Sequence, residues 1–241
     1  MEALLSLDGL LSLLTLAFLE IVLGIDNIIF ISLVTNELPE EQQPLARRLG
    51  LALALIFRVL MLLGINWLIG LTTPFFHLGE HPVSGRDAIL FLGGLFLLAK
   101  SSSEMVKKTE GKGHGESHAK ARGMVGKILQ IGLLDIVFSF DSVLTAIGMT
   151  QELTIMIVAV VISMLIMLAF AKSIAAFIER HLSLQILALS FLILIGTVLI
   201  AESAHVEIPK PYIYSSVGFA LLVQLLSIRA GERNAAKKDA E

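Results

Sequence analysis

Long apolar blocks, separated by short polar or proline-bearing stretches, run along the whole chain. A helix that spans a bilayer needs about 20 mostly apolar residues. Seven blocks meet this requirement to within a few residues at each end. We therefore predict an all-α membrane protein with seven transmembrane helices, over residues 9–35, 46–70, 87–105, 128–150, 153–178, 183–203 and 212–229.

Composition supports a membrane protein and excludes several other classes. The 241 residues are 56% hydrophobic and 16% charged, whereas soluble domains contain about 45–50% apolar and 25% charged residues. The excess apolar surface predicts the lipid bilayer as a partner. A net charge of −3 gives no reason to expect nucleic acid. The absence of cysteine excludes disulfides, thiolate metal ligands and thiol redox chemistry.

Lysine and arginine collect in alternate loops, which predicts the orientation because cytoplasmic loops carry an excess of these residues. With the N-terminus outside, only Arg86 and Lys210 fall in outer loops. The inner loops and C-terminal tail then hold Arg47, Arg48, Lys107, Lys108, Lys112, Lys120, Arg122, Lys127, Lys172, Arg180, Arg229, Arg233, Lys237 and Lys238. We predict the N-terminus outside and the C-terminus in the cytoplasm.

An internal repeat divides the chain. Residues 19–27 align without gaps on residues 134–142, and residues 94–101 resemble residues 196–203. Three spans per copy would give the two copies opposite orientations, the inverted plan of many secondary transporters. We predict a first repeat over 1–106 with helices 1–3, a cytoplasmic linker loop over 107–127, a second repeat over 128–206 with helices 4–6, and a seventh helix with a cytoplasmic tail over 207–241.

Four acidic residues, Glu20, Asp26, Asp135 and Asp141, lie near the middle of spans 1 and 4. Each charge at that depth costs at least ~2.5 kcal/mol on insertion scales, so a compensating cation is expected. The repeat adds two further oxygen donors, Asn27 and Ser142. The predicted metal ligands are Glu20, Asp26, Asn27, Asp135, Asp141 and Ser142. Such hard oxygen ligands favour Mn²⁺, Ca²⁺ or Mg²⁺, and no organic cofactor is expected.

Glu20 and Asp26 lie six residues apart and therefore do not share a helix face. A helix break would bring them together, and Gly24 is the expected place, with Ser139 a weaker one in span 4. Arg58 and Lys172, within spans 2 and 5, are the expected gating residues or counter-ions.

Two further interpretations stay open at this stage. The acids in the spans could be held only by structural ion pairs with Arg58, Lys100 and Lys172. The segment His114, Glu116 and His118 has the spacing of a metal sensor but also the composition of an ordinary linker.

Five segments resemble the TerC family, in particular its YgdQ/YoaE-type bacterial members: residues 18–30, 46–52, 92–104, 133–143 and 187–196. The resemblance runs over essentially the whole chain. It implies a seven-helix inverted repeat related to the LysE-type transporters, a multi-pass location in the bacterial inner (plasma) membrane and export of Mn²⁺ or related ions. It also carries the family's functional positions onto the six ligands above. Some members are named for tellurium resistance.

We therefore expect a non-enzymatic transporter that exports Mn²⁺ by alternating access, with proton antiport as the coupling. One alternative is a partner protein that supplies metal to secreted enzymes or secretion machinery. A homodimer or an association with the secretion machinery is the protein partner expected. A less favoured alternative is an intramembrane aspartyl protease that uses Asp26 and Asp141. Residues 23–26 only partly match its GxGD motif, because the first glycine is missing.

Overall fold

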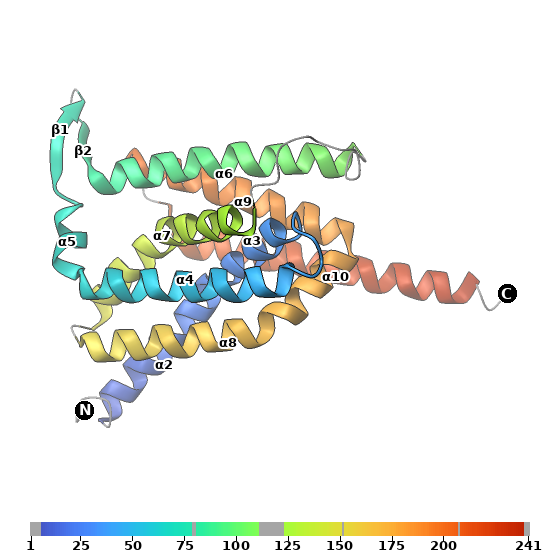
Figure 1. Cartoon of the computed structure of the whole chain (residues 1–241), viewed down its shortest axis with the longest axis horizontal. Helices are drawn as coiled ribbons and strands as arrows, with labels where there is room; N and C mark the ends of the chain where they lie inside the picture. The colour runs from blue at the N-terminus through green and yellow to red at the C-terminus, as the bar shows by residue number, and fades with distance from the viewer. Residues whose placement is uncertain (1–5, 79–80, 111–122, 151, 207, 239–241) are drawn as a thin grey trace.

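The computed structural model describes residues 6–78, 81–110, 123–150, 152–206 and 208–238, and most of them are helical (Figure 1). The elements follow in the order α2 (Leu7–Leu23), α3 (Ile25–Thr35), α4 (Gln43–Leu63), α5 (Ile65–Gly70), β1 (Pro74–Leu78), β2 (His81–Ser84), α6 (Gly85–Thr109), α7 (Met124–Met149), α8 (Leu153–Arg180), α9 (Leu182–Ser203) and α10 (Lys210–Lys238).

Within the described ranges, six helical segments are long and apolar enough to cross a membrane. They are Leu7–Thr35, which joins α2 and α3, then α6, α7, α8, α9, and Pro211–Gly231 of α10. All six coincide with predicted spans. The remaining predicted span, over 46–70, is occupied by α4 and α5. Helix α4 is 21 residues long but contains three arginines, so it carries more charge than the apolar stretches of the other six segments.

A short antiparallel hairpin of β1 and β2 replaces part of the loop that the sequence predicts between the second and third spans. Phe76 pairs with Val83 and His77 with Pro82. Pro74 and Pro82 interrupt helix formation in this stretch. Its aromatic and β-branched residues favour extended backbone, which explains why it is ordered as strands. Among the described residues, this hairpin is where the secondary structure differs from the predicted all-α fold.

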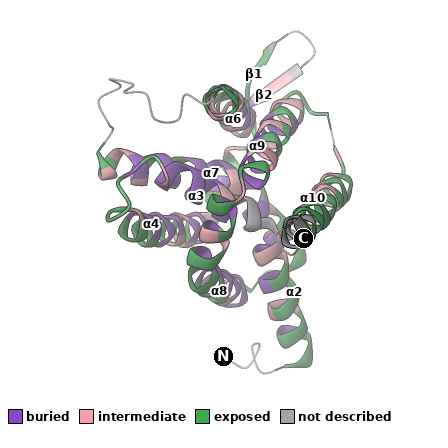
Figure 2. Cartoon of the chain, turned by 90° about the vertical axis from the view of Figure 1, so that its right-hand side faces the viewer, coloured by how far each residue is buried: buried purple, intermediate pink, exposed green. Residues whose placement is uncertain are grey.

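Helix α3 lies at the centre of the bundle, where it contacts α2, α4, α7, α8 and α9. Its side chains Phe30, Ile31 and Val34 are buried. Around it, α6 packs on α9, α4 on α7, and α2 on α8. Figure 2 shows α10 at the side of the bundle with its surface exposed. The fold therefore buries α3 and the face of α7 that packs against it.

The α6–α9 contact depends on two glycines that face each other. A Cβ atom on Gly94 would lie 2.6 Å from the carbonyl oxygen of Gly196, and one on Gly196 would lie 2.9 Å from the carbonyl oxygen of Gly94. Small residues let membrane helices approach closely enough for backbone contact. The backbones of α6 and α9 are therefore in direct contact at this point.

Candidate functional site: a buried carboxylate–arginine cluster

The first span is interrupted at Gly24. Helix α2 ends at Leu23 and α3 begins at Ile25, and the Gly24 amide donates to the Ile21 carbonyl oxygen at 3.2 Å. A Cβ atom on Gly24 would collide with the Met167 side chain of α8. Glycine therefore allows both the change of helix and the close packing, and Glu20 and Asn27 lie on opposite sides of the break.

The weaker expectation of a break at Ser139 is wrong, because α7 is one continuous helix over Met124–Met149. Serine keeps its backbone within the regular hydrogen-bond ladder, and glycine is less favourable in a helix by about 0.5 kcal/mol relative to serine. The Ser139 hydroxyl instead donates to Asp135 Oδ2 at 3.1 Å, one turn earlier in the same helix. Ser139 thus belongs to the site as a hydrogen-bond donor.

Arg58 of α4 joins the acidic residues of the two matched segments. Its Nη1 donates to Glu20 Oε2 in a short ion pair. Its Nε and Nη2 donate to the two oxygens of Asp135 at 3.3 and 3.1 Å. One guanidinium therefore binds a carboxylate from α2 with one edge and a carboxylate from α7 with another. The structure thus brings Glu20 and Asp135, which the internal repeat equates, to a common partner.

Asp135 is also bound from α3. Asn27 Nδ2 donates to Asp135 Oδ1 at 3.3 Å. Ser142 lies two turns further along α7, where its hydroxyl donates to the Ser139 carbonyl oxygen at 3.2 Å. Of the predicted ligands, the structure thus assembles Glu20, Asn27 and Asp135 around Arg58, with Ser142 close by in sequence on the same helix.

The cluster is almost completely buried. Arg58 is 2% exposed, and Glu20 and Asp135 are each 4% exposed. Two carboxylates and one guanidinium carry one net negative charge, and burial strengthens every electrostatic interaction because the local dielectric is low. An arrangement of this kind requires close pairing, since a buried charge without a partner strongly destabilises a fold.

Several predicted site residues lie either outside this cluster or outside the described part of the structure. The side chains of Asp26 and Asp141 lie outside the described part of the structure, as does the segment with His114, Glu116 and His118. Lys172 is exposed on α8 and forms no ion pair within the described part of the chain. Among the side chains that are described, no three acidic or histidine residues converge as a metal site would.

Comparison with known proteins decides the family. The sequence profile of the integral membrane protein TerC family matches residues 5–239. The chain belongs to the TerC family. It is 49% identical over 223 residues to a UPF0053 protein of Haemophilus influenzae, which covers 92% of this chain and 94% of that protein. It is also 49% identical over 220 residues to the UPF0053 inner membrane protein YgdQ of Escherichia coli strain K12, covering 91% and 92% of the two chains.

A longer relative matches over the same region. The UPF0053 inner membrane protein YoaE of Escherichia coli strain K12 is 43% identical over 216 residues, which are 89% of this chain and 42% of YoaE. No solved structure matches this chain. Family membership, inner-membrane relatives and six apolar helices together make this TerC-family chain a multi-pass inner membrane protein.

The structure also reveals polar contacts in this TerC-family chain that sequence reasoning missed. Arg47 donates to Thr35, Asn36 and Gln43 and pairs with Glu179 of α8. A second network joins Glu37 to residues of α6 and α7. The sequence does show these charged residues near the ends of predicted spans, where charges are expected at the membrane interface. It does not show their partners, because most of the partners are distant along the chain.

Proposed function

We propose that this TerC-family protein is a transporter, not an enzyme, that exports a divalent cation, Mn²⁺ in the first instance, from the cytoplasm. Its site would consist of Glu20, Asp26, Asn27, Asp135, Asp141 and Ser142. The observation that carries the proposal is the convergence of two buried carboxylates, Glu20 and Asp135, from different helices on one guanidinium.

Charge is the first argument for a cation as substrate. Arg58 supplies one positive charge to two carboxylates, and Asp26 and Asp141 follow Glu20 and Asp135 by six residues in the sequence. Acidic residues within membrane helices are costly, and they characterise ion pathways and proton relays. Carboxylate, amide and hydroxyl oxygens are the ligands that Mn²⁺, Mg²⁺ and Ca²⁺ accept. A divalent ion would therefore balance this cluster better than the arginine does.

The second argument is the internal repeat. The alignment equates Glu20 with Asp135 and Gly94 with Gly196, and in both cases the equated residues meet: the acids at Arg58 and the glycines backbone to backbone. Residues related by a two-fold axis meet only near that axis. In Figure 1 the equated helices α6 and α9 run in opposite directions, which supports two inverted copies, with α10 as the seventh span.

Orientation rests on where the fold gathers its basic residues. Arg47 pairs with Glu179, Lys108 donates to Gln185 and Lys127 pairs with Glu37, so the ends of several helices meet at one basic end of the bundle. This end would face the cytoplasm, with the N-terminus outside, because cytoplasmic loops carry the excess of lysine and arginine.

In the proposed cycle, Arg58 acts as an internal cation. Mn²⁺ arriving from the cytoplasm would displace Arg58 or protons from the carboxylates, and the two repeats would then rock to open the site outward. After release, Arg58 and protons would again neutralise the acids, which makes proton antiport the natural coupling. The ion can shift the two conformations only as far as it binds one of them better than the other.

The test is Mn²⁺ flux in proteoliposomes that contain the purified protein. Asp26→Asn and Asp141→Asn should abolish flux, because each removes one ligand charge while keeping the side chain's size. Asp8→Asn is the matched control, since Asp8 is exposed in the first turn of α2. Undiminished flux in both variants would refute the proposal. Protein that binds Mn²⁺ but moves it only with an added partner would instead support the metal-supplying alternative.

A further inference from the structure

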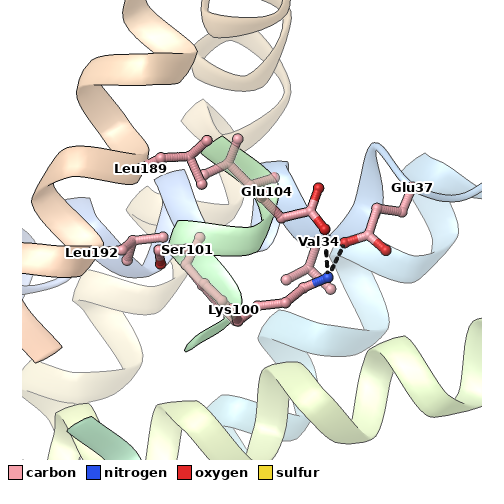
Figure 3. A pocket seen from close by; sticks show the side chains of 9 residues that line it. Val34, Glu37, Lys100, Ser101, Glu104, Leu189 and Leu192 are labelled. Carbon is pink, nitrogen blue, oxygen red and sulfur yellow. Dashed lines mark hydrogen bonds and ion pairs between the residues drawn. The ribbon is translucent and has the colours of Figure 1, made fainter. Parts of the chain in front are cut away.

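A small half-open cavity, with room for about one water molecule, lies between α3, α6 and α9, away from the carboxylate–arginine cluster. Its apolar wall includes Phe30 and Val34 of α3, together with leucines of α9. Its polar wall consists of Glu37, Lys100, Ser101 and Glu104 (Figure 3). The cavity therefore has a charged side and an apolar side.

Ion pairs surround the charged side of this cavity. Lys100 Nζ lies 2.8 Å from Glu37 Oε1 and 2.8 Å from Glu104 Oε1, so one ammonium group bridges two carboxylates (Figure 3). Lys127 of α7 also pairs with Glu37, and Lys107 pairs with Glu104 at 2.8 Å. These contacts tie the turn after α3 to α6 and α7. Since the side chains involved are partly exposed, such pairs are weak enough to break and re-form.

The apolar side of the cavity leads toward the buried cluster along α3. Asn27 and Val34 are seven residues apart and therefore share a face of the helix, with a separation of about 10 Å along its axis. Phe30 lies between them, is 3% exposed, and contacts Phe138 of α7 edge to face with 6.4 Å between ring centroids. Phe30 thus lines the cavity, packs on Phe138 and lies on α3 between Val34 and Asn27.

Ser101 gives the cavity a polar group with spare bonding capacity. The side chain lines the cavity and the residue is only 2% exposed. A hydroxyl can donate one hydrogen bond and accept two, so its position in the wall suits a hydrated ion that passes by.

We propose that this cavity is the cytoplasmic vestibule of the transport pathway and that Lys100, bridging Glu37 and Glu104, is its gate. The inference rests on the proposed function and adds the route and the gate to it. Removal of Lys100 takes one positive charge from the mouth and leaves Glu37 with Lys127 and Glu104 with Lys107, so the mouth attracts cations more strongly. Displacement of Phe30 from Phe138 then opens the way to the acidic cluster. The structure accordingly represents a state that is closed toward the cytoplasm.

Thiol accessibility tests the gate without reference to transport. The chain contains no cysteine, so a single introduced thiol is the only reactive group. Ser101→Cys and, in a second protein, Val34→Cys would be treated in membrane vesicles with a membrane-impermeant maleimide on either face. Ser163→Cys is the control, because Ser163 is completely buried in α8.

Labelling of both vestibule cysteines is expected from the cytoplasmic face. It should be faster by about tenfold in a Lys100→Met background, as expected for the loss of two partly exposed ion pairs. The Ser163→Cys protein should stay unlabelled. Cysteines that react only from the outer face, or that stay inert with Lys100→Met, would overturn the vestibule, and equal rates in the two backgrounds would overturn the gate. Gated labelling in a protein without Mn²⁺ flux would refute the proposed function alone.

Discussion

Arg58→Met is the sharpest test of the carboxylate–arginine cluster. Arg58 binds Glu20 through one nitrogen and Asp135 through two, and all three residues are buried. Methionine fills a similar volume but has no charge and no donor. The variant would therefore leave two carboxylates in the interior without the cation that joins them.

The magnitude follows from the cost of breaking a buried ion pair. Removal of one partner destabilises a protein by about 3–5 kcal/mol, because the other charge stays buried. For a chain of this size, 1 kcal/mol lowers the melting temperature by about 2–4 °C, so Arg58→Met should melt about 6–20 °C lower than the wild type in metal-free detergent. Arg58→Lys should fall between the two, since lysine keeps the charge but cannot bind Asp135 with two nitrogens.

Metal should reverse part of this loss. A bound ion stabilises the folded state by about 2.7 kcal/mol at 100 times its dissociation constant. If the proposed function holds, Mn²⁺ competes with Arg58 in the wild type but meets no competitor in Arg58→Met, so the variant should show the larger Mn²⁺-dependent rise. Thermal unfolding followed by intrinsic fluorescence or light scattering over a Mn²⁺ titration measures both effects. A metal-free melting temperature within about 2 °C of the wild type, or an equal Mn²⁺ response in both proteins, would refute the reasoning.

Two further substitutions test the packing of the bundle. Gly94→Ala should lower stability by about 1–3 kcal/mol, because its methyl group meets the Gly196 backbone, while Gly218→Ala, with nothing within 4 Å, should be neutral or slightly stabilising. Arg47→Gln should cost about 1–3 kcal/mol through its lost bonds at the basic end, whereas its exposed neighbour, changed by Arg48→Gln, should stay within about 0.5 kcal/mol. Chemical unfolding in detergent compares each pair, and equal stabilities within a pair would contradict the packing described.

The local features were largely predictable from sequence. Apolar length located the helices, since each helix must supply its own backbone hydrogen bonds in lipid. Gly24 likewise indicated a helix break, because the backbone freedom of glycine depends on that residue alone. The hairpin over Pro74–Ser84 was missed, because a pair of strands depends on register between two segments rather than on composition alone.

What the sequence by itself determined is the set of apolar helices and the presence of acids deep within them, because both follow from residue type and position along one segment. The tertiary structure alone decided that Glu20 and Asp135 share Arg58, that Ser139 donates to Asp135, and that Lys100 bridges Glu37 and Glu104. Contacts of this kind join distant parts of the chain. Their partners depend on how the helices pack and rotate, which no single segment specifies.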